Sequence, residues 1–140
     1  MKYRELKGYK YQLVDRVVVD TGLPVELYGS IHTEYIILRR TGRLFIKPGY
    51  CWDGASGPTI DTQNTFKASL VHDALYQLMR ERLILQRHRK HVDELLRKML
   101  IEAGMSKFRA SIWYWAVRKF AKKSATDKQK PRGKIVEIKD

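Results

Sequence analysis

The sequence contains a single cysteine, Cys51, which excludes an intrachain disulfide and a metal site built from several cysteines. We expect Cys51 to be a small, half-buried residue, because a catalytic thiol needs an activating partner that the sequence does not supply. No apolar run approaches the roughly 20 residues that a membrane-spanning helix needs. The N-terminal stretch MKYRELKGYKYQ lacks the apolar core of a signal peptide. These absences predict a protein that is made in the cytoplasm of the cell that produces it.

Acidic residues are also scarce, since the 140 residues include 15 acidic and 28 basic side chains and give a net charge of +13. The excess is concentrated in residues 71–140, which hold 18 basic and 8 acidic residues. A basic C-terminal half fits an anionic partner such as nucleic acid, an anionic membrane surface or an acidic protein. A solvated helical face with a solubilising tail fits the same charge, so charge alone does not choose the partner.

The first 49 residues predict β-structure. Residues 11–22 are rich in β-branched side chains, as strands are. Residues 34–50 divide into two short strands around residues 40–43, which predicts a hairpin. A loop with two glycines follows over residues 50–64.

Helical periodicity begins after this loop and predicts three helices within residues 65–122, at about 66–83, 87–104 and 106–122. Gly104 is placed to end the second of them. We expect the second helix to bury Val92, Leu95, Leu96, Met99, Leu100 and Ala103. We expect the third to bury Phe108, Ile112, Trp115 or Ala116, and Phe120.

The order of these elements, strands first and helices afterwards, predicts an α+β fold. We expect a single domain over residues 1–122, in which the N-terminal strands and hairpin pack against a three-helix unit. Residues 123–140 are polar and basic, which predicts a flexible tail.

The first helix carries a His72–Asp73 pair inside an apolar segment. Adjacent helical residues point about 100° apart, so at least one of the two faces the interior or a cleft. Tyr76 follows His72 by one turn and projects from the same side. Asp93 comes directly after the core position Val92, so packing of the first two helices is expected to bring Asp93 to the imidazole. A carboxylate on one ring nitrogen would leave the other nitrogen as a general base.

Asp73 fits two environments. Its carboxylate suits a hard cation, with carbonyl oxygens from the loop around Gly54 and Gly57 completing the ligand shell. It also suits the backbone N–H groups of that loop. The His72–Asp73 pair as a whole is also compatible with a hydrogen-bonded structural pair that performs no chemistry, and spacing alone favours that interpretation.

Four motifs carry a resemblance to a known family: WDGASGPT, ASLVHDALYQLMR, RKHVDELLRKMLIEAGM and ASIWYWAVRKF, in this order. Together they resemble a family of short phage and prophage proteins that is defined only as a domain of unknown function. The resemblance covers roughly residues 45–120. It implies a viral or prophage origin and no established activity.

A more distant resemblance concerns the loop, the His-Asp-x-x-Tyr motif and the later aspartate. This arrangement is similar to the active site of calcium-dependent phospholipase A-two enzymes and of the related lipase segment of parvovirus capsid proteins, which has no disulfides. The resemblance implies that His72 deprotonates the attacking water, that Asp93 orients His72, and that Tyr76 donates a hydrogen bond to Asp93.

The same resemblance implies a calcium site in which Asp73 is a ligand, with the carbonyl oxygens of Trp52, Gly54 and Ser56 completing the shell. Ser56 departs from the enzymes, which prefer glycine there. Asp53 has no standard role in them, and the β-rich first 45 residues have no counterpart.

Two functions follow as hypotheses. The first is a calcium-dependent lipid-ester hydrolase or membrane-perturbing factor, whose basic helices face an anionic membrane surface and whose aromatic run 113–115 offers interfacial anchoring. Core packing is the preferred interpretation of that run. The second is a non-enzymatic virion structural or assembly protein that keeps the His-Asp core and binds DNA, an acidic partner or other phage structural proteins through its basic face.

Two further interpretations of the sequence have less support. A metal-dependent phosphohydrolase of the HD type would use His72 and Asp73 as ligands of a transition metal. Such domains are all-helical, and His88 and His91 lie in a basic run that favours the surface. Plain nucleic-acid binding has no recognisable module to support it.

Overall fold

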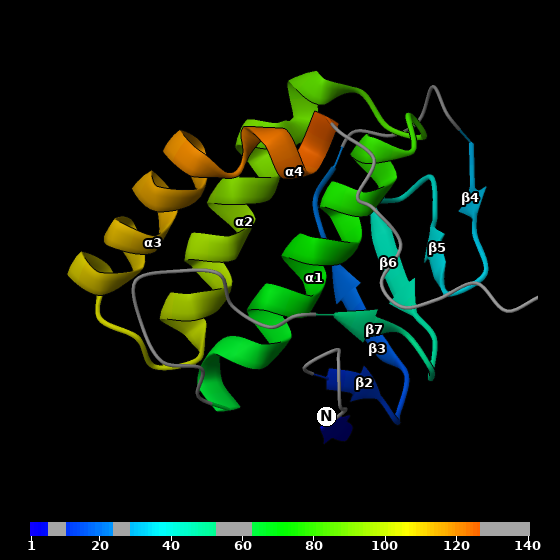
Figure 1. Cartoon of the computed structure of the whole chain (residues 1–140), viewed down its shortest axis with the longest axis horizontal. Coiled ribbons are helices and arrows are strands. Elements are labelled where there is room, and N and C mark those ends of the chain that lie inside the picture. Colours follow the sequence, from blue (N-terminus) through cyan, green and yellow to red (C-terminus); the bar gives the residue numbers. More distant parts are fainter. Residues whose placement is uncertain (6–10, 24–28, 53–62, 127–140) are drawn as a thin grey trace, which may run out of the picture.

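The computed structural model describes residues 1–5, 11–23, 29–52 and 63–126. Within these ranges the strands precede the helices, and antiparallel sheets pack against a helical unit (Figure 1). The α+β fold predicted from the sequence is therefore confirmed.

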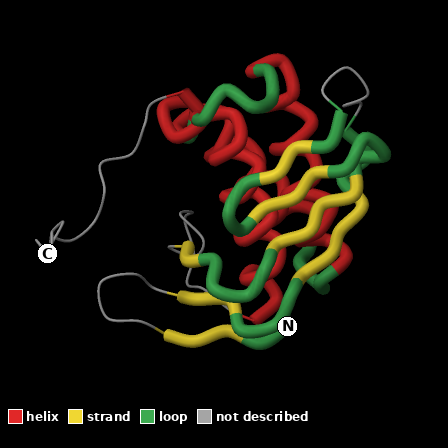
Figure 2. Tube along the Cα trace, turned by 90° about the vertical axis from the view of Figure 1, so that its right-hand side faces the viewer, coloured by secondary structure: helices red, strands yellow, loops and turns green. Residues whose placement is uncertain are grey.

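The described strands form two antiparallel sheets. The smaller one has the order β1 (Tyr3–Glu5), β2 (Tyr11–Leu13), β7 (Cys51–Trp52). The larger one has the order β3 (Val17–Asp20), β6 (Arg43–Ile46), β5 (Ile36–Leu38), β4 (Ile31–His32). Figure 2 shows the larger sheet as a layer in front of the helices.

The hairpin predicted around residues 40–43 is confirmed, because β5 and β6 pair in antiparallel register with Leu38 opposite Leu44. Gly42 makes its turn with φ +87°, a conformation that L side chains rarely adopt. Along β6, Leu44 and Ile46 are buried and alternate with more exposed residues, as expected for a sheet with one face on the core.

Four α-helices and one 3-10 helix are present in the described residues. They are α1 (Gln63–Arg80), η2 (Gln86–His88), α2 (Arg89–Glu102), α3 (Lys107–Phe120) and α4 (Lys122–Thr126). The short α4 lies mostly in the segment that we expected to be a tail, and its Ala125 is fully buried. None of the helices in the described ranges has the length and apolar content needed to cross a membrane.

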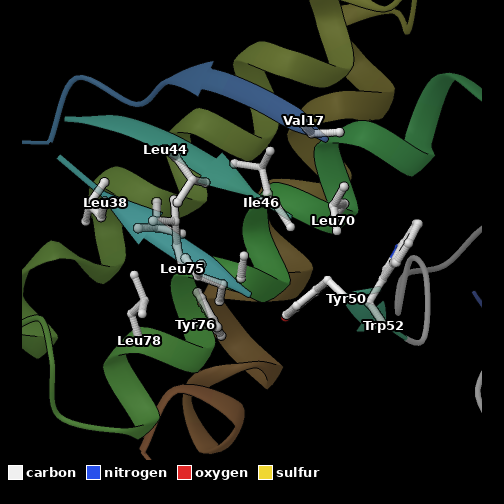
Figure 3. Packing of buried hydrophobic residues seen from close by; sticks show 14 of the residues in the cluster. Val17, Leu38, Leu44, Ile46, Tyr50, Trp52, Leu70, Leu75, Tyr76 and Leu78 are labelled. Atoms are coloured by element: carbon white, nitrogen blue, oxygen red, sulfur yellow. The ribbon is translucent and has the colours of Figure 1, made fainter. Parts of the chain in front are cut away.

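The core has two parts. The larger part lies between the sheets and α1, where residues such as Leu44 and Ile46 face Leu70 and Leu75 (Figure 3). The smaller part lies between α2 and α3 and includes Leu96 and Leu100 of α2. Helix α2 thus packs on α1 through one side and on α3 through another.

The predicted core face of α2 is largely correct. Val92, Leu95, Leu96 and Leu100 are buried, and Met99 is half-buried. Ala103 was wrongly included: the helix ends at Glu102, so Ala103 is an exposed C-cap residue. Gly104 follows with φ +107°, the left-handed conformation expected just beyond a helix end.

The predicted core face of α3 is wrong. The residues that pack on α2 are Ala110, Trp113 and Val117, which recur at i, i+3 and i+7. The fully buried Ala110 has a small side chain, which lets α3 come close to α2. The residues expected to be buried are instead exposed or half-exposed: Phe108, Ile112, Trp115 and Phe120 are exposed, and Ala116 is half-buried.

Candidate active site

The candidate site is centred on Asp93, whose side chain is fully buried between α1 and α2. His72 Nε2 lies 2.7 Å from Asp93 Oδ1, and the Tyr76 hydroxyl donates to the same oxygen at 2.6 Å. His72 and Tyr76 are one turn apart on α1, so their rings lie together, with centroids 4.0 Å apart. The contacts of Asp93 with His72 and Tyr76 that the sequence predicted are confirmed.

Two arginines complete the surroundings of Asp93. Arg118 of α3 donates from Nη1 to Asp93 Oδ2 at 2.9 Å, and Arg89 of α2 brings Nε to within 3.9 Å of that oxygen. Arg89 also donates to the Tyr76 hydroxyl at 3.1 Å and to the backbone carbonyls of Val117 and Arg118 at 3.1 and 2.7 Å. Side chains of three helices therefore meet at one buried carboxylate.

Sequence reasoning missed both arginines. Arg89 precedes Asp93 by four residues, so helical spacing could have indicated the contact. Arg118 lies in a basic run on another helix, and nothing in its local sequence distinguishes it from the exposed Lys119.

These contacts set the charge of the site. Burial alone would raise the pKa of Asp93, but hydrogen bonds from His72, Tyr76 and Arg118 and the charge of His72 outweigh it, so its pKa is lowered. Burial raises the pKa of Tyr76, and the adjacent Asp93 carboxylate raises it further. Asp93 is therefore an ionised acceptor, and Tyr76 remains a neutral donor.

The two ring nitrogens of His72 have different environments. Nε2 faces the ionised Asp93, so Nε2 carries the proton and donates it. Nδ1 lies 4.0 Å from Asp73 Oδ1, beyond hydrogen-bond distance. Burial lowers the pKa of His72, whereas its interactions with Asp73 and Asp93 raise it and prevail. The raised pKa favours the protonated ring, and when the ring is neutral its Nδ1 lone pair lies on the side of Asp73.

Asp73 lies at the partly open side of the site, with 34% of its side chain exposed. Gln77 is one turn further along α1 on the same face, and it accepts a hydrogen bond from the Tyr50 hydroxyl at 3.0 Å. Burial raises the pKa of Tyr50, and the charge of Asp73 adds to the rise. Tyr50, at the start of the glycine-bearing loop, thus lies beside the helix face that carries Asp73.

The predicted metal ligands are placed only in part. Trp52 is buried in β7, and Asp73 is partly exposed on α1, while Gly54 and Ser56 lie outside the described residues. Across the described ranges, no group of three or more His, Cys, Asp or Glu side chains is arranged to hold a metal ion. The predicted site uses one carboxylate and several carbonyl oxygens, a donor set that suits calcium.

Other candidate residues of the sequence analysis have structural positions. His88 is buried, contrary to expectation, because η2 turns it inward, and burial with the charges of Arg87 and His91 lowers its pKa. His91 Nε2 contacts the Thr21 carbonyl oxygen at 2.7 Å, which ties α2 to the sheet. Cys51 is half-buried as expected, and burial raises its pKa.

Together, fold and site define a class of protein: an α+β domain in which three helices converge on a buried His–Asp pair. The chain belongs to the family described as "Protein of unknown function (DUF1353)", which matches residues 30–117. No curated protein and no solved structure matches the chain.

Proposed function

We propose that the protein is a calcium-dependent hydrolase of lipid esters, of the phospholipase A-two type, and that it derives from a phage or prophage. One observation carries the proposal. Asp93 contacts one nitrogen of His72, while the other nitrogen lies 4.0 Å from the Asp73 carboxylate, so the base and the candidate cation ligand are neighbours on α1.

Each residue of the site has a separate role in the proposed hydrolysis. His72 takes a proton from a water molecule at Nδ1, and that water attacks the ester carbonyl carbon. Asp93 stabilises the imidazolium that forms, and its hydrogen bond to Nε2 fixes the ring. Tyr76 and Arg118 hold the Asp93 carboxylate in place. The imidazolium then returns the proton to the leaving alcohol.

Asp73 and the carbonyl oxygens of Trp52, Gly54 and Ser56 would hold the calcium ion. When bound, calcium polarises the ester carbonyl and stabilises negative charge on its oxygen. Asp73 fits this role because its carboxylate is partly open to solvent, and because Tyr50, at the start of the loop, contacts Gln77 one turn further along α1.

Calorimetric calcium titration of wild type and Asp73→Asn tests the proposal. We expect wild type to bind calcium with a Kd between about 1 μM and 1 mM, in the range of many protein calcium sites, and the variant to lose the binding. Asp15→Asn is the matched control, since Asp15 is an exposed carboxylate whose partner, Lys2, is 4.0 Å away. Absence of binding in wild type, or equal binding by Asp73→Asn, contradicts the proposal.

Hydrolysis of phospholipid vesicles is the second measurement. His72→Ala should abolish calcium-dependent fatty-acid release while the variant stays folded by circular dichroism. If His72→Ala unfolds most of the protein but the fraction that stays folded releases fatty acid at the wild-type rate, His72 has a structural role only.

The arginines favour a second candidate function. Arg118 and Arg89 surround the second oxygen of Asp93, an arrangement that ties three helices together whether or not any chemistry occurs. We therefore keep as an alternative a non-enzymatic virion or assembly protein, made in the host cytoplasm, whose basic face binds DNA or an acidic phage protein. Co-purification with intact particles, without calcium binding or hydrolysis, would support it.

A further inference from the structure

Helix α3 has an apolar stripe on the side opposite its core face. Phe108, Ile112 and Trp115 recur at i, i+4 and i+7, and their exposed fractions are 78%, 42% and 68%. The core residues Ala110 and Val117 point the other way, toward α2. In Figure 1, α3 lies at the edge of the molecule, with α2 between it and α1.

Basic side chains surround this stripe. The segment 106–126 contains no acidic residue. Five of its six lysines and arginines are exposed, namely Lys107, Arg109, Lys119, Lys122 and Lys123. At the C-terminal end Phe120 is 76% exposed, and the Lys119 ammonium lies 5.5 Å from the centre of its ring. The surface thus combines aromatic groups with a dense positive charge.

We propose that this face of α3 docks on an anionic lipid bilayer. Lysines and arginines that flank an apolar stripe are typical of a helix that lies in the membrane interface. Its aromatic side chains would lie at the level of the headgroups, and its lysines and arginines would contact the lipid phosphates. The proposal is independent of hydrolysis, because docking needs neither calcium nor the His72 base.

Charge and polarity argue against three other partners for this face of α3: a second copy of the chain, its own C-terminal segment and nucleic acid. A second copy would bring the same basic, acid-free segment against itself. Residues 127–140 carry five basic and three acidic residues, so the chain's own C-terminus has the same net sign. Nucleic acid would match the charge, but its phosphates offer no apolar phase for Phe108 and Ile112.

Trp115 supplies a built-in reporter. Trp52 and Trp113 are 3% and 2% exposed, whereas Trp115 is 68% exposed. Before vesicles are added, part of the tryptophan emission should therefore be that of a hydrated indole. Insertion of Trp115 into a bilayer should shift the emission to shorter wavelength.

The experiment measures binding of the full-length protein to large vesicles, in EDTA, by co-sedimentation and by tryptophan emission. Vesicles of phosphatidylcholine with about 30 mol% phosphatidylglycerol, whose anionic headgroups give a negative surface potential, are compared with vesicles of pure phosphatidylcholine. We expect at least roughly tenfold tighter binding to the anionic vesicles, together with the blue shift.

Two double variants separate the apolar and charged contributions. Phe108→Ser with Trp115→Ser should weaken binding by roughly tenfold or more. Lys119→Glu with Lys122→Glu should weaken binding to anionic vesicles by a similar factor and leave pure phosphatidylcholine unaffected. Leu85→Ser, 48% exposed outside α3, and Lys67→Glu on α1 are the matched controls and should bind like wild type.

Several outcomes would overturn the proposal. They are equal binding by the α3 variants and wild type, no preference for anionic vesicles, or Trp115 emission already blue-shifted before vesicles are added. Binding to duplex DNA, or dimerisation in the ultracentrifuge, that depends on Phe108 and Trp115 in the absence of vesicle binding would assign the face to that partner instead.

Discussion

A buried carboxylate is costly unless each of its oxygens has partners, and Asp93 has them on both sides. His72 and Tyr76 contact Oδ1, while Arg118 contacts Oδ2. These charged and neutral donors explain why an apolar helix pair accepts an aspartate that is fully buried. They also fix the His72 ring, because Nε2 must point toward Asp93 and Nδ1 must point toward Asp73.

We predict that Asp73→Asn lowers the pKa of His72, measured by NMR titration of the ring protons. The pKa of His72 lies above the ordinary value of about 6.5, and Asp73 contributes to that rise. In wild type the charged ring therefore stabilises the fold at low pH, and this contribution is lost as pH rises through the folded-state pKa. Asp20→Asn, a change at an exposed carboxylate paired with Arg43, should leave the midpoint unchanged. An unaltered midpoint in Asp73→Asn would mean that Asp73 does not act on Nδ1.

At the residue scale, the sequence predicted the pairs that follow from helical spacing. Tyr76 lies one turn from His72, and Asp93 adjoins a core position of the next helix, so the sequence alone places both beside the imidazole. Arg118 could not, because its contact with Asp93 depends on how α3 is rotated against α2.

At the scale of elements, that rotation is also what the sequence left ambiguous. The hairpin was predictable because strand alternation and Gly42 specify one register. In α3, apolar residues lie on two opposite sides, so both Trp113 and Trp115 satisfy a helical stripe. Packing selects the side of Ala110, whose small side chain allows close approach to α2.

The β5–β6 turn gives a prediction about backbone conformation. Gly42→Ala should destabilise the protein by about 2–4 kcal/mol, because φ is +87° and an added Cβ would meet the Leu23 carbonyl oxygen at 3.0 Å. Gly29→Ala is the matched control: its φ is +67°, but a Cβ there meets nothing within 4 Å. It should cost only about 1–2 kcal/mol, the conformational part. Urea unfolding measures both, and equal losses would contradict the steric argument.

At the scale of the whole molecule, the two parts of the core are joined rather than separate. Met99 and Ala121 are partly buried and contact both clusters. Asp93 links the same layers through polar contacts, since its partners lie on α1, α2 and α3. Arg80 and Gln86 also donate to backbone carbonyls of α4, at 2.9 and 2.7 Å. The layers from sheet to α3 should therefore unfold as one unit.

Trp113→Ala tests this cooperativity, because Trp113 is the largest side chain of the α2–α3 cluster. Trp113→Ala combined with Trp115→Phe leaves Trp52 as the sole tryptophan, which reports on the smaller sheet, while far-ultraviolet circular dichroism reports mainly on the helices. We expect the denaturation midpoints of the two signals to coincide and to shift together to lower denaturant. The free energy of unfolding should fall by about 3–5 kcal/mol. Phe120→Ala, at a side chain that is 76% exposed, should change neither signal. If the helical signal were lost at lower denaturant than the Trp52 signal, α3 would be an independently unfolding layer, and the links through Met99 and Asp93 would be too weak to couple it to the sheets.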